Sequence, residues 1–108
     1  MLPAELPENK ELLKSILAPL FDDFLYWFDR SLQALEKEQL SFMDEQEQQA
    51  FMARIRQSQA EVGAAKSMFN AMDGSACIDM RVIAPWHQLV TECWSIARKN
   101  RQFKATEG

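Results

Sequence analysis

Residues 12–35, LLKSILAPLFDDFLYWFDRSLQAL, decide the fold because their large apolar side chains recur every three or four residues. That spacing places them on one face of an α-helix. The expected inner face consists of Leu13, Ile16, Leu17, Leu20, Phe24, Trp27, Phe28, Ser31 and Leu35. We therefore expect a first helix from about Asn9, as its N-cap, to Glu38. Pro19 removes one backbone donor, so this helix should either be kinked near Ser15 or be split into two pieces.

A second helix is predicted by a capping-box spacing further along the chain. Asp44 is followed three residues later by Glu47 and preceded by the apolar Met43. The apolar pattern continues from there to about Met72. The dipeptide Asp73–Gly74 should end the helix, because glycine accepts a left-handed conformation.

The third helix has two alternative starts. Pro85 suits the first turn of a helix, where its missing N–H costs nothing. A start at Asp79 is the alternative, and Pro85 would then bend the helix. In both cases the pattern Trp86, Leu89, Val90, Cys93 continues to about Phe103.

Three long segments with short connections predict an all-α fold, an antiparallel up-down-up three-helix bundle. Residues 1–108 should form a single domain, with its core at about 9–103 and mobile tails at Met1 to Glu8 and Lys104 to Gly108. Such a thin bundle has a modest core, so pairing with a second copy would cover more apolar surface.

Composition and charge exclude several classes of protein. Apolar residues make up 47% and charged residues 26%, as in ordinary globular domains. The net charge of −4 argues against nucleic-acid binding, which draws on a basic surface. The late basic cluster Arg98, Lys99, Arg101 and Lys104 is favoured by its position near a helix C-terminus, whose dipole end is negative, and a small anionic contact there is the alternative.

Membrane crossing and export are not expected. The most apolar run, Leu12 to Leu25, is interrupted by Lys14, Asp22 and Asp23, so it cannot span a bilayer. The N-terminus lacks the pattern of a secretory signal. The two cysteines of such a chain are expected to be free thiols in a reducing compartment. We expect a cytoplasmic protein, with peripheral membrane contact left open.

The stretch APWHQLVTECW, residues 84–94, resembles a reactive site because it combines histidine, glutamate and cysteine. On a helix these groups separate: Cys93 faces the core, Glu92 points outward and His87 lies at the edge beside Trp94. A zinc site would need further close ligands, and a Cys–His pair would need contact. The chain also lacks phosphate-loop, dinucleotide-binding and nucleophile-elbow motifs. We expect no enzyme, no metal and no cofactor.

The apolar surface is broader than one bundle core needs, and this favours an interaction surface. The candidate interface residues are Leu25, Tyr26, Trp27, Trp86, His87 and Trp94. The first hypothesis is a non-catalytic module that binds a protein partner or itself. The alternative is a helical bundle that binds a tetrapyrrole or lipid, lined by Trp27, Trp86, His87 and Trp94.

At LLKSILAPLFDDFLYWFDRS, residues 12–31, and PWHQLVTECW, residues 85–94, the chain resembles a family of short cyanobacterial proteins known only as a domain of unknown function. The resemblance extends over about Leu12 to Ala97. No activity and no catalytic residues can be carried over from this family. The resemblance does imply an accessory or assembly role for photosynthetic complexes, photosystem II in particular, in the cytoplasm or at the thylakoid surface.

Overall fold

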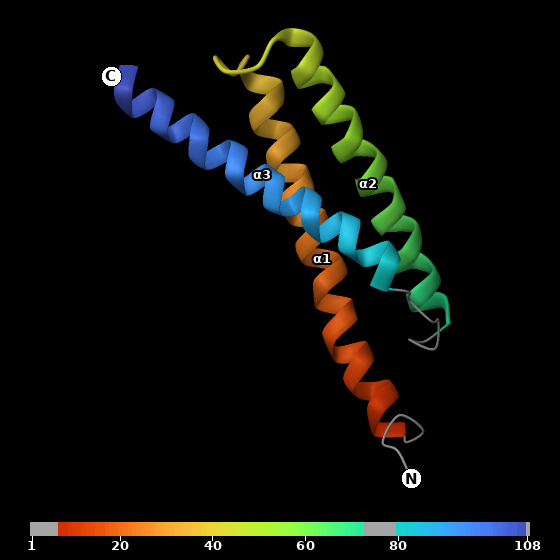
Figure 1. The fold of residues 1–108 in the computed structure, drawn as a ribbon. Coiled ribbons are helices and arrows are strands. Elements are labelled where there is room, and N and C mark those ends of the chain that lie inside the picture. The colour runs from red at the N-terminus through yellow and green to blue at the C-terminus, as the bar shows by residue number, and fades with distance from the viewer. Residues whose placement is uncertain (1–6, 73–79, 108) are drawn as a thin grey trace.

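The computed structural model of the chain describes residues 7–72 and 80–107, which form three α-helices and, within those ranges, no strand. The helices are α1 (Pro7–Lys37), α2 (Glu45–Ala71) and α3 (Met80–Glu107). Helices α1 and α2 run antiparallel side by side, and α3 crosses them (Figure 1). The all-α, three-helix prediction is confirmed.

Both prolines lie inside helices. Helix α1 is a single helix that contains Pro19, so the alternative of two separate pieces is wrong, and a bend there stays a prediction. Because α1 begins at Pro7, Asn9 lies within it and is not its N-cap. Helix α3 begins before Pro85, as the earlier of the two predicted starts required. Asp79 itself lies outside the described residues.

The ends of the helices differ in part from the sequence-based expectation. Helix α3 continues to Glu107, so the predicted end at Phe103 and the predicted mobile tail from Lys104 are corrected to helix. Helix α2 ends at Ala71, and the Met72 N–H donates to the Met68 carbonyl at 3.0 Å. The predicted stop at Asp73–Gly74 and the remaining tail residues, 1–6 and 108, lie outside the described residues.

The capping box at the start of α2 is present in both halves. The Glu47 backbone N–H donates to the Asp44 carboxylate at 2.7 Å, and the Asp44 N–H donates to the Glu47 carboxylate at 3.0 Å. These bonds satisfy two backbone donors that a helix start leaves without partners. The sequence-based prediction of this helix start is confirmed.

Aromatic side chains from all three helices form the centre of the core. The Phe21 ring of α1 lies 5.5 Å from Phe69 of α2 and 6.5 Å from Trp86 of α3, both edge to face. Phe24 lies 6.0 Å from Trp86 in the same manner. Such aromatic pairs stabilise the fold by more than the burial of their apolar area alone. The buried face of α1 differs from the prediction at two residues: Ile16, a predicted member, is 54% exposed, and Leu32, which was not predicted, is buried.

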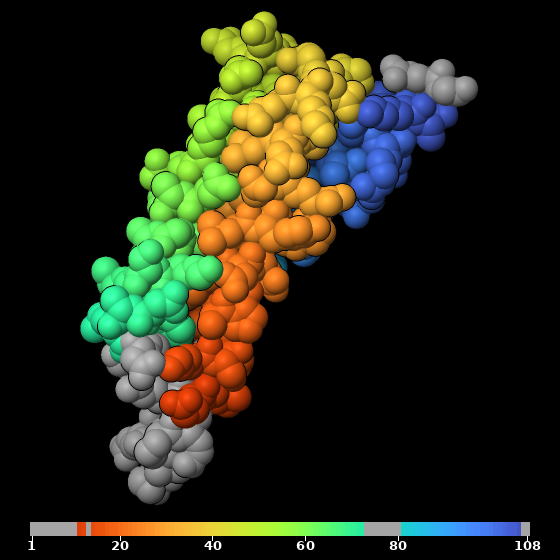
Figure 2. All heavy atoms as spheres, turned by 180° about the vertical axis from the view of Figure 1, so that it is seen from behind, coloured from red at the N-terminus to blue at the C-terminus, as the bar shows by residue number. Residues whose placement is uncertain are grey.

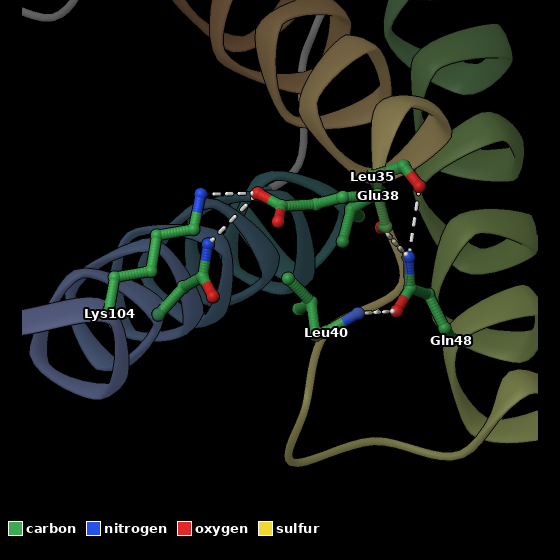
Figure 3. Close-up of polar contacts among 6 residues, drawn as sticks. Leu35, Glu38, Leu40, Gln48 and Lys104 are labelled. Carbon is green, nitrogen blue, oxygen red and sulfur yellow. Dashed lines mark hydrogen bonds and ion pairs between the residues drawn. The ribbon is translucent and has the colours of Figure 1, made fainter. Parts of the chain in front are cut away.

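Gln48 connects the end of α1 to α2. Its carboxamide accepts from the Leu40 N–H and donates to the carbonyls of Leu35 and Glu38, each at 2.9 Å (Figure 3). The last carbonyls of a helix have no partner within the helix. The Gln48 carboxamide donates to carbonyls at the end of α1, so all of its bonds are made within the protein. This polar side chain is therefore buried, at 2% exposure.

The C-terminal half of α3 diverges from the α1–α2 pair (Figure 1), and the molecule measures 59 × 23 × 19 Å. Phe103 of α3 stacks on Phe42 of the connector, with ring centres 5.2 Å apart. The Lys104 ammonium contacts the Glu38 carboxylate at 2.7 Å. These contacts hold the diverging half of α3 near the end of α1 and leave an opening between the two helices.

Candidate functional site

An open groove of about 970 Å³ lies between α1 and α3, and we call it the α1–α3 groove. Figure 2 shows the C-terminal half of α3, in blue, beside the second half of α1, in orange and yellow. The groove has an aromatic part formed by Tyr26, Trp27 and Trp94. It also has a basic part formed by Arg30, Lys37, Arg98 and Arg101.

The aromatic part joins the two helices at the surface. The rings of Trp27 and Trp94 meet edge to face, with centres 5.5 Å apart, and Tyr26 meets Trp27 at 5.0 Å. Tyr26 is 54% exposed and Trp94 is 44% exposed. Tryptophan and tyrosine present large apolar areas with a polar edge, and they are enriched where proteins bind one another.

The basic part consists of four cations that have no carboxylate partner among residues 7–72 and 80–107. The Arg30 guanidinium lies over the Tyr26 ring, 6.0 Å from its centre, and contacts its hydroxyl at 3.4 Å. Within the part of the chain that the structure describes, none of the four basic groove residues forms an ion pair. The ion pairs found there engage other cations instead: Arg54 with Glu92, Arg56 with Glu36, Lys66 with Asp22 and Lys104 with Glu38.

The groove lining also includes small side chains: Ser31 and Ala34 of α1, and Cys93 and Ala97 of α3. Cys93 is 4% exposed and is a free thiol. Burial raises the pKa of Cys93, so the thiol stays protonated at neutral pH and is a poor nucleophile. Between these residues the groove adjoins a smaller hollow of about 210 Å³, whose lining includes Leu35, Leu40 and Phe51.

The structure brings together three of the six predicted interface residues. Tyr26, Trp27 and Trp94 line the α1–α3 groove. Leu25 is half-buried against the core, and His87 is exposed on α3 but outside the groove lining. Trp86 is only 2% exposed. Its place in the predicted interface is corrected, because it belongs to the core.

Of the four residues predicted to line a tetrapyrrole or lipid site, Trp27 and Trp94 lie in the α1–α3 groove, whereas Trp86 and His87 do not. Trp86 packs against Phe21 and Phe24 inside the bundle, away from the Trp27–Trp94 pair. The glutamate of residues 84–94 is engaged by a neighbouring helix. Glu92 points toward α2, where its carboxylate receives two hydrogen bonds from Arg54, at 2.9 and 3.1 Å. Among residues 7–72 and 80–107, no group of three His, Cys, Asp or Glu side chains is placed to hold a metal.

A polar contact that the sequence did not indicate supports Trp86. The indole N–H donates to the Glu61 carboxylate of α2 at 3.0 Å. This bond, together with one from Gln57, lowers the pKa of Glu61 below its usual value. Helical spacing alone did not reveal it, because Glu61 lies beside the buried face of α2 and not in it.

The described helices were expected not to cross a membrane. Within residues 7–72 and 80–107, no helix combines the length and apolar character needed to cross a bilayer.

Comparison with known proteins gives a single assignment. Residues 7–102 match the model of the family described as Protein of unknown function (DUF2605). No curated protein and no solved structure matches the chain.

Proposed function

The chain belongs to the DUF2605 family, and we propose that it is a non-catalytic module that binds a partner protein in the α1–α3 groove. The observation that carries the proposal is the exposed aromatic contact between Trp27 and Trp94, which lies on two helices beside an open groove. Tryptophan residues that line a pocket are the side chains that most often dominate binding energy at protein interfaces.

The chemistry of the groove favours binding over catalysis. Its thiol, Cys93, is buried and has a raised pKa. The groove carboxylate, Glu38, is engaged by Lys104 at 2.7 Å and has a lowered pKa, so it is a weak base. A nucleophile or general base needs the opposite shifts.

We extend the proposal to the setting that the family resemblance implies. In that setting the protein is an accessory or assembly factor for cyanobacterial photosynthetic complexes, photosystem II above all, in the cytoplasm or at the thylakoid surface. Copurification with photosystem II assembly intermediates, lost in a Trp94→Ala variant, is the expected result. Copurification that is unchanged in the variant would contradict this use of the groove.

Site-specific photo-crosslinking tests the binding function. A benzophenone amino acid replaces Trp94 in one variant and Gln49, an exposed residue of α2, in the control. Irradiation in the native host should give a discrete crosslinked protein at position 94 and none at position 49. A product of twice the chain mass would identify the partner as a second copy. No product at position 94, or the same products at both positions, would contradict the proposal.

A further inference from the structure

We infer that the occupant of the α1–α3 groove is an acidic peptide segment of a partner protein. Its carboxylates would contact the basic part of the groove, and an apolar side chain would pack beside Trp27 and Trp94. This inference rests on the proposed function and names the chemistry of the partner.

The distribution of charge supports an acidic partner. The chain is acidic overall, with 12 basic against 16 acidic residues, yet its groove gathers four cations against one carboxylate. That carboxylate, Glu38, is already paired with Lys104. The four cations form no ion pair within the described residues, and they come from two helices that face the same opening. Complementary potentials steer association and select partners.

The helix dipole explains only part of this cluster. Lys37 lies in the last turn of α1, and Lys104 lies in the last turn of α3. Helix α3 ends at Glu107, so Arg98 lies nine residues before its end and Arg101 lies six residues before it. The dipole effect is confined to the last turn of a helix. The two arginines therefore call for another explanation.

The shape of the groove favours a chain segment over a small molecule or a bilayer. Its volume of about 970 Å³ is near the upper end for small-molecule sites, and it is open to solvent. Its cations line a recess between two helices beside an aromatic pair, whereas a bilayer presents a broad, flat surface. Guanidinium groups bind carboxylates through two parallel hydrogen bonds, so arginines at these positions suit Asp and Glu side chains.

Selection from a random peptide library tests the inference. A phage-displayed library of 14-residue peptides is selected on the immobilised full chain, and the affinities of enriched peptides are measured by fluorescence anisotropy. We expect the enriched peptides to combine two or more Asp or Glu with a nearby Trp, Phe or Leu. Their affinity for the protein should fall as salt screens the charges.

Two variants with the same net charge give the matched comparison. Arg98→Ala/Arg101→Ala and Gln46→Glu/Gln49→Glu each change the net charge from −4 to −6, and all four side chains are exposed. The arginine variant should bind the enriched peptides about 5- to 30-fold more weakly, from two partly exposed ion pairs. The glutamine variant should stay within about twofold of the wild type, because its new charges lie on α2. Circular dichroism is the control that both variants fold.

The failure of this inference differs from the failure of the proposed function. Enrichment of neutral or basic peptides, or affinity that is equal in the two variants, would overturn the acidic partner. If Trp94→Ala abolished binding of such neutral or basic peptides, the proposed function, partner binding in the α1–α3 groove, would still stand. Failure of the wild-type protein to enrich any peptide, with binding to phosphatidylglycerol vesicles instead, would overturn the peptide inference in favour of a lipid surface.

Discussion

Replacing Gln48 should cost more stability than any other polar substitution in the described part of α2. The side chain is 2% exposed and makes three hydrogen bonds of 2.9 Å that join α2 to the end of α1 and the connector. Each such bond contributes about 0.5–1.5 kcal/mol, and a buried backbone group left without a partner costs about 1–3 kcal/mol. For Gln48→Ala we expect a loss of about 2–4 kcal/mol, a large share of the stability of a small domain.

Gln48→Glu separates the hydrogen bonds from the volume of the side chain. The introduced carboxylate can still accept from the Leu40 N–H, but it has no donor for the carbonyls of Leu35 and Glu38. It also places a negative charge at the negative end of the α1 dipole. Its folded-state pKa should therefore be raised, so the penalty relative to wild type should grow as pH rises through that pKa and shrink in acid.

Urea unfolding followed by circular dichroism, at pH 7 and at about pH 4, measures both effects. Gln49→Glu is the control, because it introduces the same charge at the exposed neighbour of Gln48. We expect Gln49→Glu to stay within about 0.5 kcal/mol of wild type. Equal free energies of unfolding for the two glutamate variants would refute the role assigned to the Gln48 carboxamide.

Three further results are expected. The hydrogen bond from Trp86 lowers the pKa of Glu61 below its usual value, so the stability that this carboxylate contributes is lost as pH falls through its folded-state pKa. In Glu61→Gln the midpoint of unfolding should fall less than in the wild type as pH is lowered. An equal fall in the two proteins would contradict the hydrogen bond. In a Cys77→Ser background, Cys93 should react with a thiol reagent far more slowly in the native state than in denaturant, because it is buried and its pKa is raised; equal rates would contradict its burial. His87 is exposed, so His87→Ala should change the free energy of unfolding by no more than about 0.5 kcal/mol, and a larger loss would make the histidine structural.

The features that the sequence predicted correctly are those set by local spacing. The capping box of Asp44 and Glu47 depends on residues three apart, and both of its bonds are present. The aromatic face of α1 depends on helical periodicity, and Phe24 and Phe28 are buried as expected. The place of Cys93 on the inner face of α3 follows from the same periodicity.

The features that the sequence did not predict depend on how the helices meet. Gln48 is in the first turns of α2, where a glutamine is ordinarily exposed, and it is buried only because the end of α1 lies against it. The charge of the groove depends on the crossing of α1 and α3 and on the length of α3. A helix ending at Phe103 would have placed Arg101 in the last turn, where the helix dipole favours a positive charge. The longer α3 places Arg98 and Arg101 along the groove instead.

Binding of an acidic peptide in the α1–α3 groove can be mapped by nuclear magnetic resonance of the isotope-labelled protein, titrated with a peptide enriched from the library. The chain has three indole N–H groups, of which Trp27 and Trp94 line the groove and Trp86 is buried against Glu61. If the peptide binds in the α1–α3 groove, the indole signals of Trp27 and Trp94 and the backbone signals of Arg98 and Arg101 will shift, while the Trp86 indole signal will not. Shifts confined to the exposed face of α2, around Gln49, would contradict binding in the groove.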